Sequence, residues 1–155
     1  MTAPSASVSA LRPKEFHFPL SVEWTGERHV DVHVDGKAAL EIMPPPVFKG
    51  VDPAAWSPED LFVAAAASCL AVTFTGLAER AGLAYEALKV DGDGVAGVRP
   101  DGKFGFTRLL LHLELTAAAS DGEEARALAE RAEETCLVAA SLDLPVETEI
   151  VVNHT

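Results

Sequence analysis

The two cysteines of this 155-residue chain are the side chains with the most distinctive chemistry. Cys69 lies in the run Ala-Ala-Ser-Cys-Leu, and Cys136 lies in the run Glu-Thr-Cys-Leu. Their separation fits neither a CxxC redox motif nor a zinc ribbon, and many buried cysteines are inert packing residues. Each nevertheless lies on an apolar face of an expected helix. If these faces pack together the sulfurs meet, and a bond between them would be transient and catalytic rather than structural.

A reactive cysteine must be a thiolate, which requires a lowered pKa. Burial in the middle of a helix acts in the opposite direction, so we expect a cation to be delivered from outside the helix. Arg28, at the turn between the first two expected strands, is the best candidate because a guanidinium tolerates partial burial. A buried arginine needs a carboxylate, for which Glu59 is the candidate. The alternative for Glu59 is a simple charge at a helix start.

Glu59 and Cys69 are ten residues apart on one expected helix. At 1.5 Å per residue they lie about 15 Å apart along its axis, too far to share a site within one chain. They could share one if two subunits pack these helices antiparallel. The helix also carries more apolar surface than one small domain needs. The sequence therefore predicts a homodimer with two sites at the interface, each mixing residues from both chains.

The first 43 residues predict a β-meander. Apolar residues alternate with polar ones from Phe16 to Trp24 and again from Val30 to Val34, which is typical of half-buried strands. Asp35-Gly36 is a strong hairpin signal before a third strand. Pro44-Pro45-Pro46 ends that strand, since proline cannot donate to a ladder.

A long helix is expected from Pro58 to about Ala81. Ser57 is a good N-cap, Pro58 suits the first helical position, and Gly82 suits the position after the end. Residues 61–77 contain no charged side chain, which indicates a central helix covered by a sheet, a partner subunit or both. Strands are expected over residues 83–98, 104–115 and 146–152, with a second helix starting at Asp121 and carrying Cys136. The order βββ-α-ββ-α-β predicts an α+β domain over residues 15–155, after a mobile tail at residues 1–14.

Charge and composition exclude several function classes. The formal net charge of −12 disfavours nucleic acid and anionic membrane surfaces as partners, because both need a basic face. We expect no membrane-spanning segment, and the first residues lack the apolar core of a secretory signal. These features predict a cytoplasmic protein.

No metal or cofactor site is expected. His29 and His33 would be separated by about 13 Å on a strand, too far for one ion. The chain contains no GxGxxG, Walker or GxSxG motif.

The segment from Ser57 to Cys69 resembles the Asn-Pro-Glu-(Glu/Gln)-Leu…Ala-Ala…Ala-Cys helix of the osmotically induced and organic hydroperoxide resistance proteins, the OsmC/Ohr superfamily. It keeps that family's ten-residue spacing between the glutamate and the first cysteine. The second cysteine follows about 65 residues later, before a final strand. The resemblance covers about residues 16–152. One departure is visible, because many members have Cys-Pro at the second cysteine where this chain has Cys136-Leu137.

The resemblance implies an OsmC-like fold, in which antiparallel sheets wrap a central helix of an intertwined homodimer. It implies a peroxidase in which Cys69 attacks an organic hydroperoxide and Cys136 resolves the sulfenic acid into a disulfide. Glu59 would orient the arginine, for which Arg28 fits one family placement and only Lys49 is available at the other. An external dithiol, in some relatives a lipoyl group, would restore both thiols without a cofactor. A thiol-disulfide oxidoreductase and a non-enzymatic binding dimer with core cysteines remain the alternatives.

Overall fold

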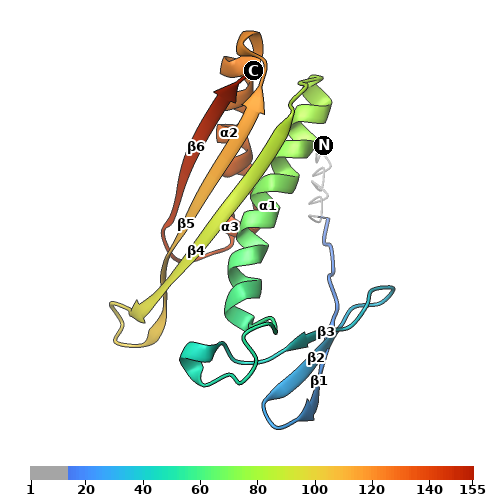
Figure 1. The fold of residues 1–155 in the computed structure, drawn as a ribbon, viewed down its shortest axis with the longest axis vertical. Coiled ribbons are helices and arrows are strands. Elements are labelled where there is room, and N and C mark those ends of the chain that lie inside the picture. Colours follow the sequence, from blue (N-terminus) through green and yellow to red (C-terminus); the bar gives the residue numbers. More distant parts are fainter. Residues whose placement is uncertain (1–13) are drawn as a thin grey trace, which may run out of the picture. The chain divides into compact units, whose positions relative to one another are not determined.

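The computed structural model describes residues 14–155, so the predicted mobile tail lies outside the described residues except for Lys14. The chain divides into two compact units, one ending at Ile42 and one formed by Met43–Thr155. Figure 1 labels the elements of both units. The single domain over residues 15–155 stays a prediction.

The N-terminal unit is a three-stranded antiparallel sheet in the order β1-β2-β3. Its strands are β1 (Ser21–Gly26), β2 (His29–His33) and β3 (Leu40–Ile42). The predicted β-meander is confirmed, but the predicted start of its first strand at Phe16 is wrong. Pro19 has no N–H with which to join a ladder, and regular pairing begins only at Ser21.

The C-terminal unit combines one sheet with three helices. It contains α1 (Pro58–Ala81), β4 (Ala87–Val98), β5 (Phe104–Ala117), α2 (Gly122–Thr135), α3 (Leu137–Ala140) and β6 (Val146–His154). Short 3-10 helices lie at Pro46–Phe48 and Ala119–Asp121. The predicted α+β class and element order are confirmed, with the second predicted helix divided into α2 and α3.

The sheet of this unit, in the order β4-β5-β6, is mixed rather than antiparallel. β4 and β5 form an antiparallel pair, whereas β5 and β6 run parallel. The prediction of purely antiparallel sheets is therefore wrong for this unit. The reason is the connection, because α2 and α3 carry the chain from the end of β5 back to its beginning, and such helical crossovers join parallel strands.

α1 begins and ends where the capping residues predict. The Ser57 hydroxyl accepts a hydrogen bond from the Asp60 N–H at 3.1 Å, and the Ser57 N–H donates to Asp60 Oδ2 at 2.9 Å. This capping box satisfies donors that have no partner in the first helical turn. Gly82 ends the helix at φ 72°, a left-handed conformation that costs glycine little.

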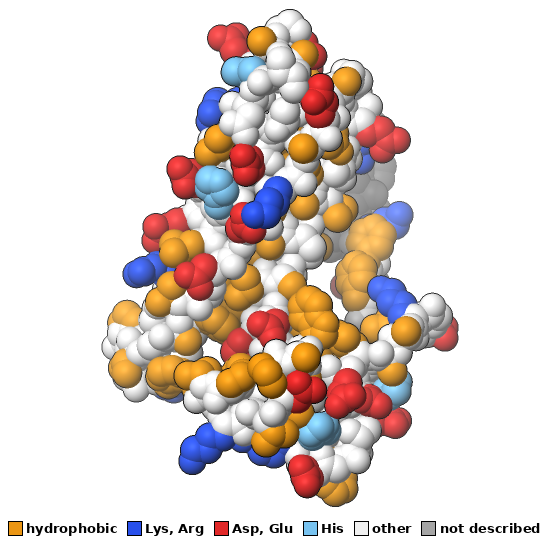
Figure 2. All heavy atoms as spheres, in the orientation of Figure 1, with side chains coloured by type: hydrophobic (Ala, Val, Ile, Leu, Met, Phe, Trp, Pro, Cys, Tyr) orange, Lys and Arg blue, Asp and Glu red, His pale blue; other side chains and the backbone are white. Residues whose placement is uncertain are grey.

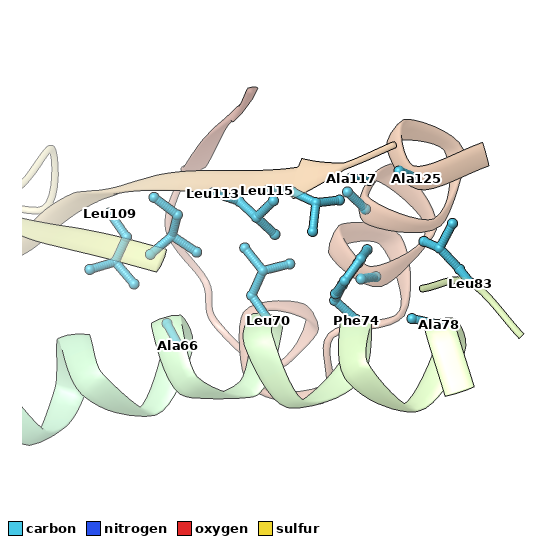
Figure 3. Packing of buried hydrophobic residues seen from close by; sticks show 13 residues of the cluster. Ala66, Leu70, Phe74, Ala78, Leu83, Leu109, Leu113, Leu115, Ala117 and Ala125 are labelled. Carbon is cyan, nitrogen blue, oxygen red and sulfur yellow. The ribbon is translucent and has the colours of Figure 1, made fainter. Parts of the chain in front are cut away.

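One face of α1 packs on the inner face of the sheet. Figure 3 shows its buried side chains pointing towards those of β5, and all are at most 1% exposed. They are Ala66, Leu70, Phe74 and Ala78 on α1, and Leu109, Leu113, Leu115 and Ala117 on β5. On the outer face of the helix Val72 is 69% exposed. The predicted burial of α1 is thus confirmed for one face, while cover for the other depends on the predicted dimer.

By length and composition alone, α1 could also cross a membrane. It has 24 residues, and its most apolar 18-residue window has a mean hydropathy of 2.0. The sequence-based exclusion of any such segment was therefore too strict. The core helix of a soluble protein meets the same criterion, and the face that carries Leu70 and Phe74 is buried against the sheet.

Glycine in β4 permits the close approach of α1. A Cβ atom at Gly94 would lie 2.7 Å from Val63 Cγ2 of α1 and 2.6 Å from the Phe106 ring. At Gly97, on the same strand, a Cβ would meet only Thr107 Cγ2 at 3.7 Å, an ordinary van der Waals distance.

We predict that Gly94→Ala lowers the free energy of unfolding by about 1–3 kcal/mol, because the added methyl group overpacks the contact between helix and sheet. Gly97→Ala is the matched control and is expected to change it by less than about 0.5 kcal/mol. Urea unfolding followed by circular dichroism measures both. Equal stability of the two variants would contradict the close approach.

Candidate active site

The fold brings the two cysteines together. Cys69 lies in the middle of α1, and Cys136 lies between α2 and α3, both of which pack against α1. The two side chains are free thiols joined by a hydrogen bond between their sulfur atoms. The two sulfurs therefore meet where α2 and α3 pack against α1, as we expected from the sequence.

The sequence predicted that Cys136 lies inside a helix, but in the structure it lies between two helices. α2 ends at Thr135, Cys136 is extended at φ −63° and ψ 111°, and helical structure resumes at Leu137. This interruption leaves the first N–H groups of α3 without acceptors inside that helix. The N–H groups of Leu137 and Val138 instead donate to the Cys69 sulfur.

The environment of Cys69 favours its ionised form. Burial raises its pKa, but hydrogen bonds to the sulfur outweigh burial and hold the pKa below the usual value for cysteine. In order of size, the donors are the Val138 N–H, the Cys136 thiol, the Thr73 hydroxyl and the Leu137 N–H. Cys69 is also partly exposed. An accessible sulfur with thiolate character is the arrangement of a nucleophile.

The environment of Cys136 favours its protonated form. Its side chain is 1% exposed, and burial is the largest cause that raises its pKa above the usual value. The hydrogen bond to Cys69 and the charge of that sulfur raise it further, against the opposing effect of the N–H groups of Ala139 and Val138. Cys136 therefore keeps its proton and donates it towards Cys69. The pair thus combines a partly exposed sulfur whose pKa is lowered with a buried sulfur whose pKa is raised.

Sequence reasoning missed the neutral donors around Cys69. We expected that only a cation could offset the effect of burial on the pKa of Cys69. In the structure, Thr73 and two N–H groups of α3 lower that pKa, and all of them belong to the same unit as Cys69. The signal available for Thr73 was its position four residues after Cys69, on the same helix face. No sequence signal marks the N–H groups, although proline in place of Leu137 would have removed one of them.

Glu59 lies in the first turn of α1, and its Oε2 atom is buried without a hydrogen-bond partner among the described residues. It lines a cavity of about 610 Å³ together with Trp56, Val63 and Phe106. Because α1 is continuous, Glu59 and Cys69 stay about 15 Å apart along the helix axis. One chain therefore does not bring them together, in agreement with the geometric expectation.

Arg28 lies in the turn between β1 and β2, in the N-terminal unit. Gly26 and Glu27 adopt positive φ angles of 140° and 48°, and Trp24 Nε1 donates to the Glu27 carbonyl at 2.9 Å. This bond anchors the tight turn that presents Arg28. Lys49, the alternative cation, follows a 3-10 helix at φ 64°. The roles of both cations stay predictions.

Two histidines of the sheets pair with carboxylates. His29 Nδ1 lies 3.0 Å from Glu41 Oε1, and His112 Nδ1 lies 3.0 Å from Glu149 Oε2. Within residues 14–155, no group of three or more histidine, cysteine, aspartate or glutamate side chains is placed to hold a metal ion.

A family model for OsmC-like proteins matches residues 50–151 of the chain. The match contains both cysteines and Glu59, whereas Arg28 lies outside it. It covers most of the C-terminal unit, in which the thiol pair lies.

Individual relatives agree with this match. An uncharacterized Bacillus subtilis protein, YmaD, is 26% identical over 88% of this chain and 93% of its own length. An OsmC-like protein of unknown function from Vibrio cholerae is 22% identical, with a TM-score of 0.81 over 88% of this chain and all of its own. An organic hydroperoxide resistance protein from Elizabethkingia anophelis is 22% identical, with a TM-score of 0.72 over 92% of this chain and all of its own.

Proposed function

The chain belongs to the OsmC-like protein family, and from this membership and its thiol pair we propose that it is a thiol peroxidase that reduces organic hydroperoxides. The observation that carries the proposal is the asymmetry of the pair. A partly exposed sulfur with a lowered pKa lies against a buried thiol with a raised pKa. Structural relatives named as organic hydroperoxide resistance proteins support the same chemistry.

In the first step, the Cys69 thiolate attacks the distal oxygen of the hydroperoxide. The S–O bond forms as the O–O bond breaks, and the alkoxide takes a proton from solvent and leaves as an alcohol. Cys69 becomes a sulfenic acid, the first product of thiolate oxidation. The apolar side chain of Leu137, next to Cys136, is exposed beside this site. It favours a substrate with an organic group over hydrogen peroxide.

The first step itself prepares the second. The thiolate of Cys69 raises the pKa of Cys136 through its hydrogen bond and its charge, in addition to burial. Conversion of Cys69 to a neutral sulfenic acid removes the charge, while the N–H groups of Ala139 and Val138 still favour the Cys136 thiolate. The pKa of Cys136 therefore falls once Cys69 is a sulfenic acid, which is the state that Cys136 must attack. Its sulfur attacks that of Cys69, the disulfide forms, and water leaves.

An external dithiol then completes the cycle by thiol-disulfide exchange. It is oxidised to its own disulfide as both protein thiols are restored. A lipoyl group is one dithiol of this class. The same sulfur pair could exchange with disulfide substrates alone, so a thiol-disulfide oxidoreductase that ignores peroxides is the second candidate function.

Glu59 and Arg28 would act at this site only in a dimer. The buried, unpartnered Oε2 of Glu59 supports the need for a donor, and a guanidinium is the donor suited to a carboxylate. Each site would contain residues of both subunits. In it, Glu59 of one subunit would hold Arg28 in position next to a Cys69 sulfur. With Cys69 ionised by neutral donors, the arginine would stabilise the charge that develops on the peroxide.

The turnover of cumene hydroperoxide with dihydrolipoamide as reductant tests the function. Wild-type protein should consume peroxide catalytically, and Cys69→Ser should consume it no faster than the dithiol alone. Cys136→Ser should perform one turnover and then stop or overoxidise. Arg28→Lys and Glu59→Gln should retain partial activity with a lower kcat/KM. If wild-type protein reduced a disulfide substrate but no peroxide, the oxidoreductase would replace the peroxidase.

The apolar outer face of α1 provides a separate test of the dimer. We expect sedimentation equilibrium to give twice the chain mass of 16.3 kDa. Val72→Glu should shift the protein towards monomer, because it places a charge on the face that the partner would cover. Glu79→Gln, at an exposed position near the end of the same helix, should remain dimeric. A monomeric wild-type protein would contradict a shared site.

A further inference from the structure

Apolar side chains gather at one end of the C-terminal unit, where the β4–β5 turn lies beside the 3-10 helix Pro46–Phe48. Figure 2 shows hydrophobic side chains collected at its lower left, the place that these two segments occupy in Figure 1. Phe48 meets Phe104 edge to face with ring centroids 6.2 Å apart, and Val98 is the register partner of Phe104. This apolar tip consists of Val47, Phe48, Val51, Val98 and Phe104, which are 38–80% exposed. An exposed apolar patch of this kind marks an interaction surface.

The loop that carries half of the apolar tip is held rigid by its own backbone. The N–H groups of Phe48 and Gly50 both donate to the Pro45 carbonyl, at 2.9 and 3.0 Å. A Cβ atom at Gly50 would collide with the Pro44 carbonyl oxygen, so glycine is required for this closure. The three consecutive prolines at 44–46 fix their φ angles. A rigid loop that already presents its side chains loses little entropy when it binds.

Three cations border the apolar tip. Lys49 lies on the loop, and Arg99 and Lys103 lie in the β4–β5 turn. None of the three forms an ion pair within residues 14–155. The carboxylates nearest to them in sequence, Asp52 and Asp101, accept backbone N–H groups of their own turns at 2.8 and 3.1 Å. At physiological salt the Debye length is about 8 Å, so acidic side chains farther away than this act weakly on the cations.

The apolar tip is continuous with a wall of the cavity that contains Glu59. Phe104 and Phe106 are two residues apart on β5 and therefore share one face of the strand. Phe106 stacks on Phe62 of α1 with ring centroids 4.4 Å apart, and it lines that cavity. Residues 53–56, which follow the tip loop, form another part of the wall. The tip therefore lies beside the cavity.

We propose that the apolar tip docks on a lipid surface, with its valines and phenylalanines among the acyl chains and its three cations at the phosphate groups. Interfacial binding increases with buried apolar area and with the attraction of cations to anionic lipid. The net charge of −12 opposes membrane binding by the rest of the chain, so the contact is confined to this end. The docking does not rest on the proposed function. Its consequence does, because docking would bring the cavity next to hydroperoxides of membrane lipids.

Flotation of the full chain with lipid vesicles tests the docking. Vesicles of phosphatidylcholine alone are compared with a mixture of phosphatidylcholine and phosphatidylglycerol. The wild-type protein should float with both and more strongly with the mixture. The double variant Val47→Ser, Val51→Ser should bind both about tenfold more weakly, because two exposed apolar side chains no longer enter the lipid. Wild-type protein that floats with neither would overturn the inference.

A pair of charge reversals separates the tip from the net charge. Lys103→Glu should weaken binding to the mixture about tenfold. Lys37→Glu, at an exposed position of the β2–β3 turn, changes the net charge equally and should float like the wild type. Equal losses in the two variants would contradict a contact through the tip.

Sedimentation equilibrium distinguishes the lipid surface from a second copy of the chain. The double variant Val47→Ser, Val51→Ser should keep the oligomeric state of the wild type. If it dissociated while its flotation was unchanged, the tip would be a contact between subunits and the lipid surface would be excluded. Flotation needs no peroxide, so the two proposals fail separately. A protein that floats through the tip but reduces no peroxide would keep the docking and lose the peroxidase.

Discussion

The conflict between burial and ionisation at Cys69 governs the rest of this site. A sulfur on a helix that packs into a core resists ionisation, so it needs donors that the same fold must supply. The interruption between α2 and α3 supplies them, because it presents the N–H groups of Leu137 and Val138 to the sulfur. The same interruption places Cys136 in hydrogen-bonding contact with Cys69. One local departure from helical structure thus both activates a thiol and provides its partner.

The sheet of the C-terminal unit fixes the positions of the helices that carry the two cysteines. α1 lies close to β4 because glycine leaves room for Val63 at Gly94, and it is anchored by Leu70 and Phe74 against β5. The parallel pairing of β5 with β6 requires the crossover formed by α2 and α3. The crossover therefore carries Cys136 to α1 as a consequence of topology. Acidic side chains are distributed over the face in Figure 2, in agreement with the formal net charge of −12.

Residue patterns predicted the elements whose signals are local. Ser57, Pro58 and Gly82 predicted the bounds of α1, and Asp35-Gly36 predicted the turn before β3. The parallel register of β6 was not predictable in this way, because it depends on how a crossover packs. For the site, cysteine identity and spacing on apolar faces predicted the meeting of the sulfurs. The donors to Cys69 were missed because two are backbone groups, which carry no residue signature.

The most direct test of the account is to add one equivalent of cumene hydroperoxide to the reduced protein and to measure its intact mass and its free thiols. We expect a monomer mass lower by two hydrogen atoms and the loss of both thiols, with Cys69 and Cys136 recovered in one disulfide-linked peptide pair. Cys136→Ser should instead gain an oxygen atom on Cys69. If the wild-type protein remained folded with both thiols free, the pair would be packing rather than catalysis, and the peroxidase would be contradicted.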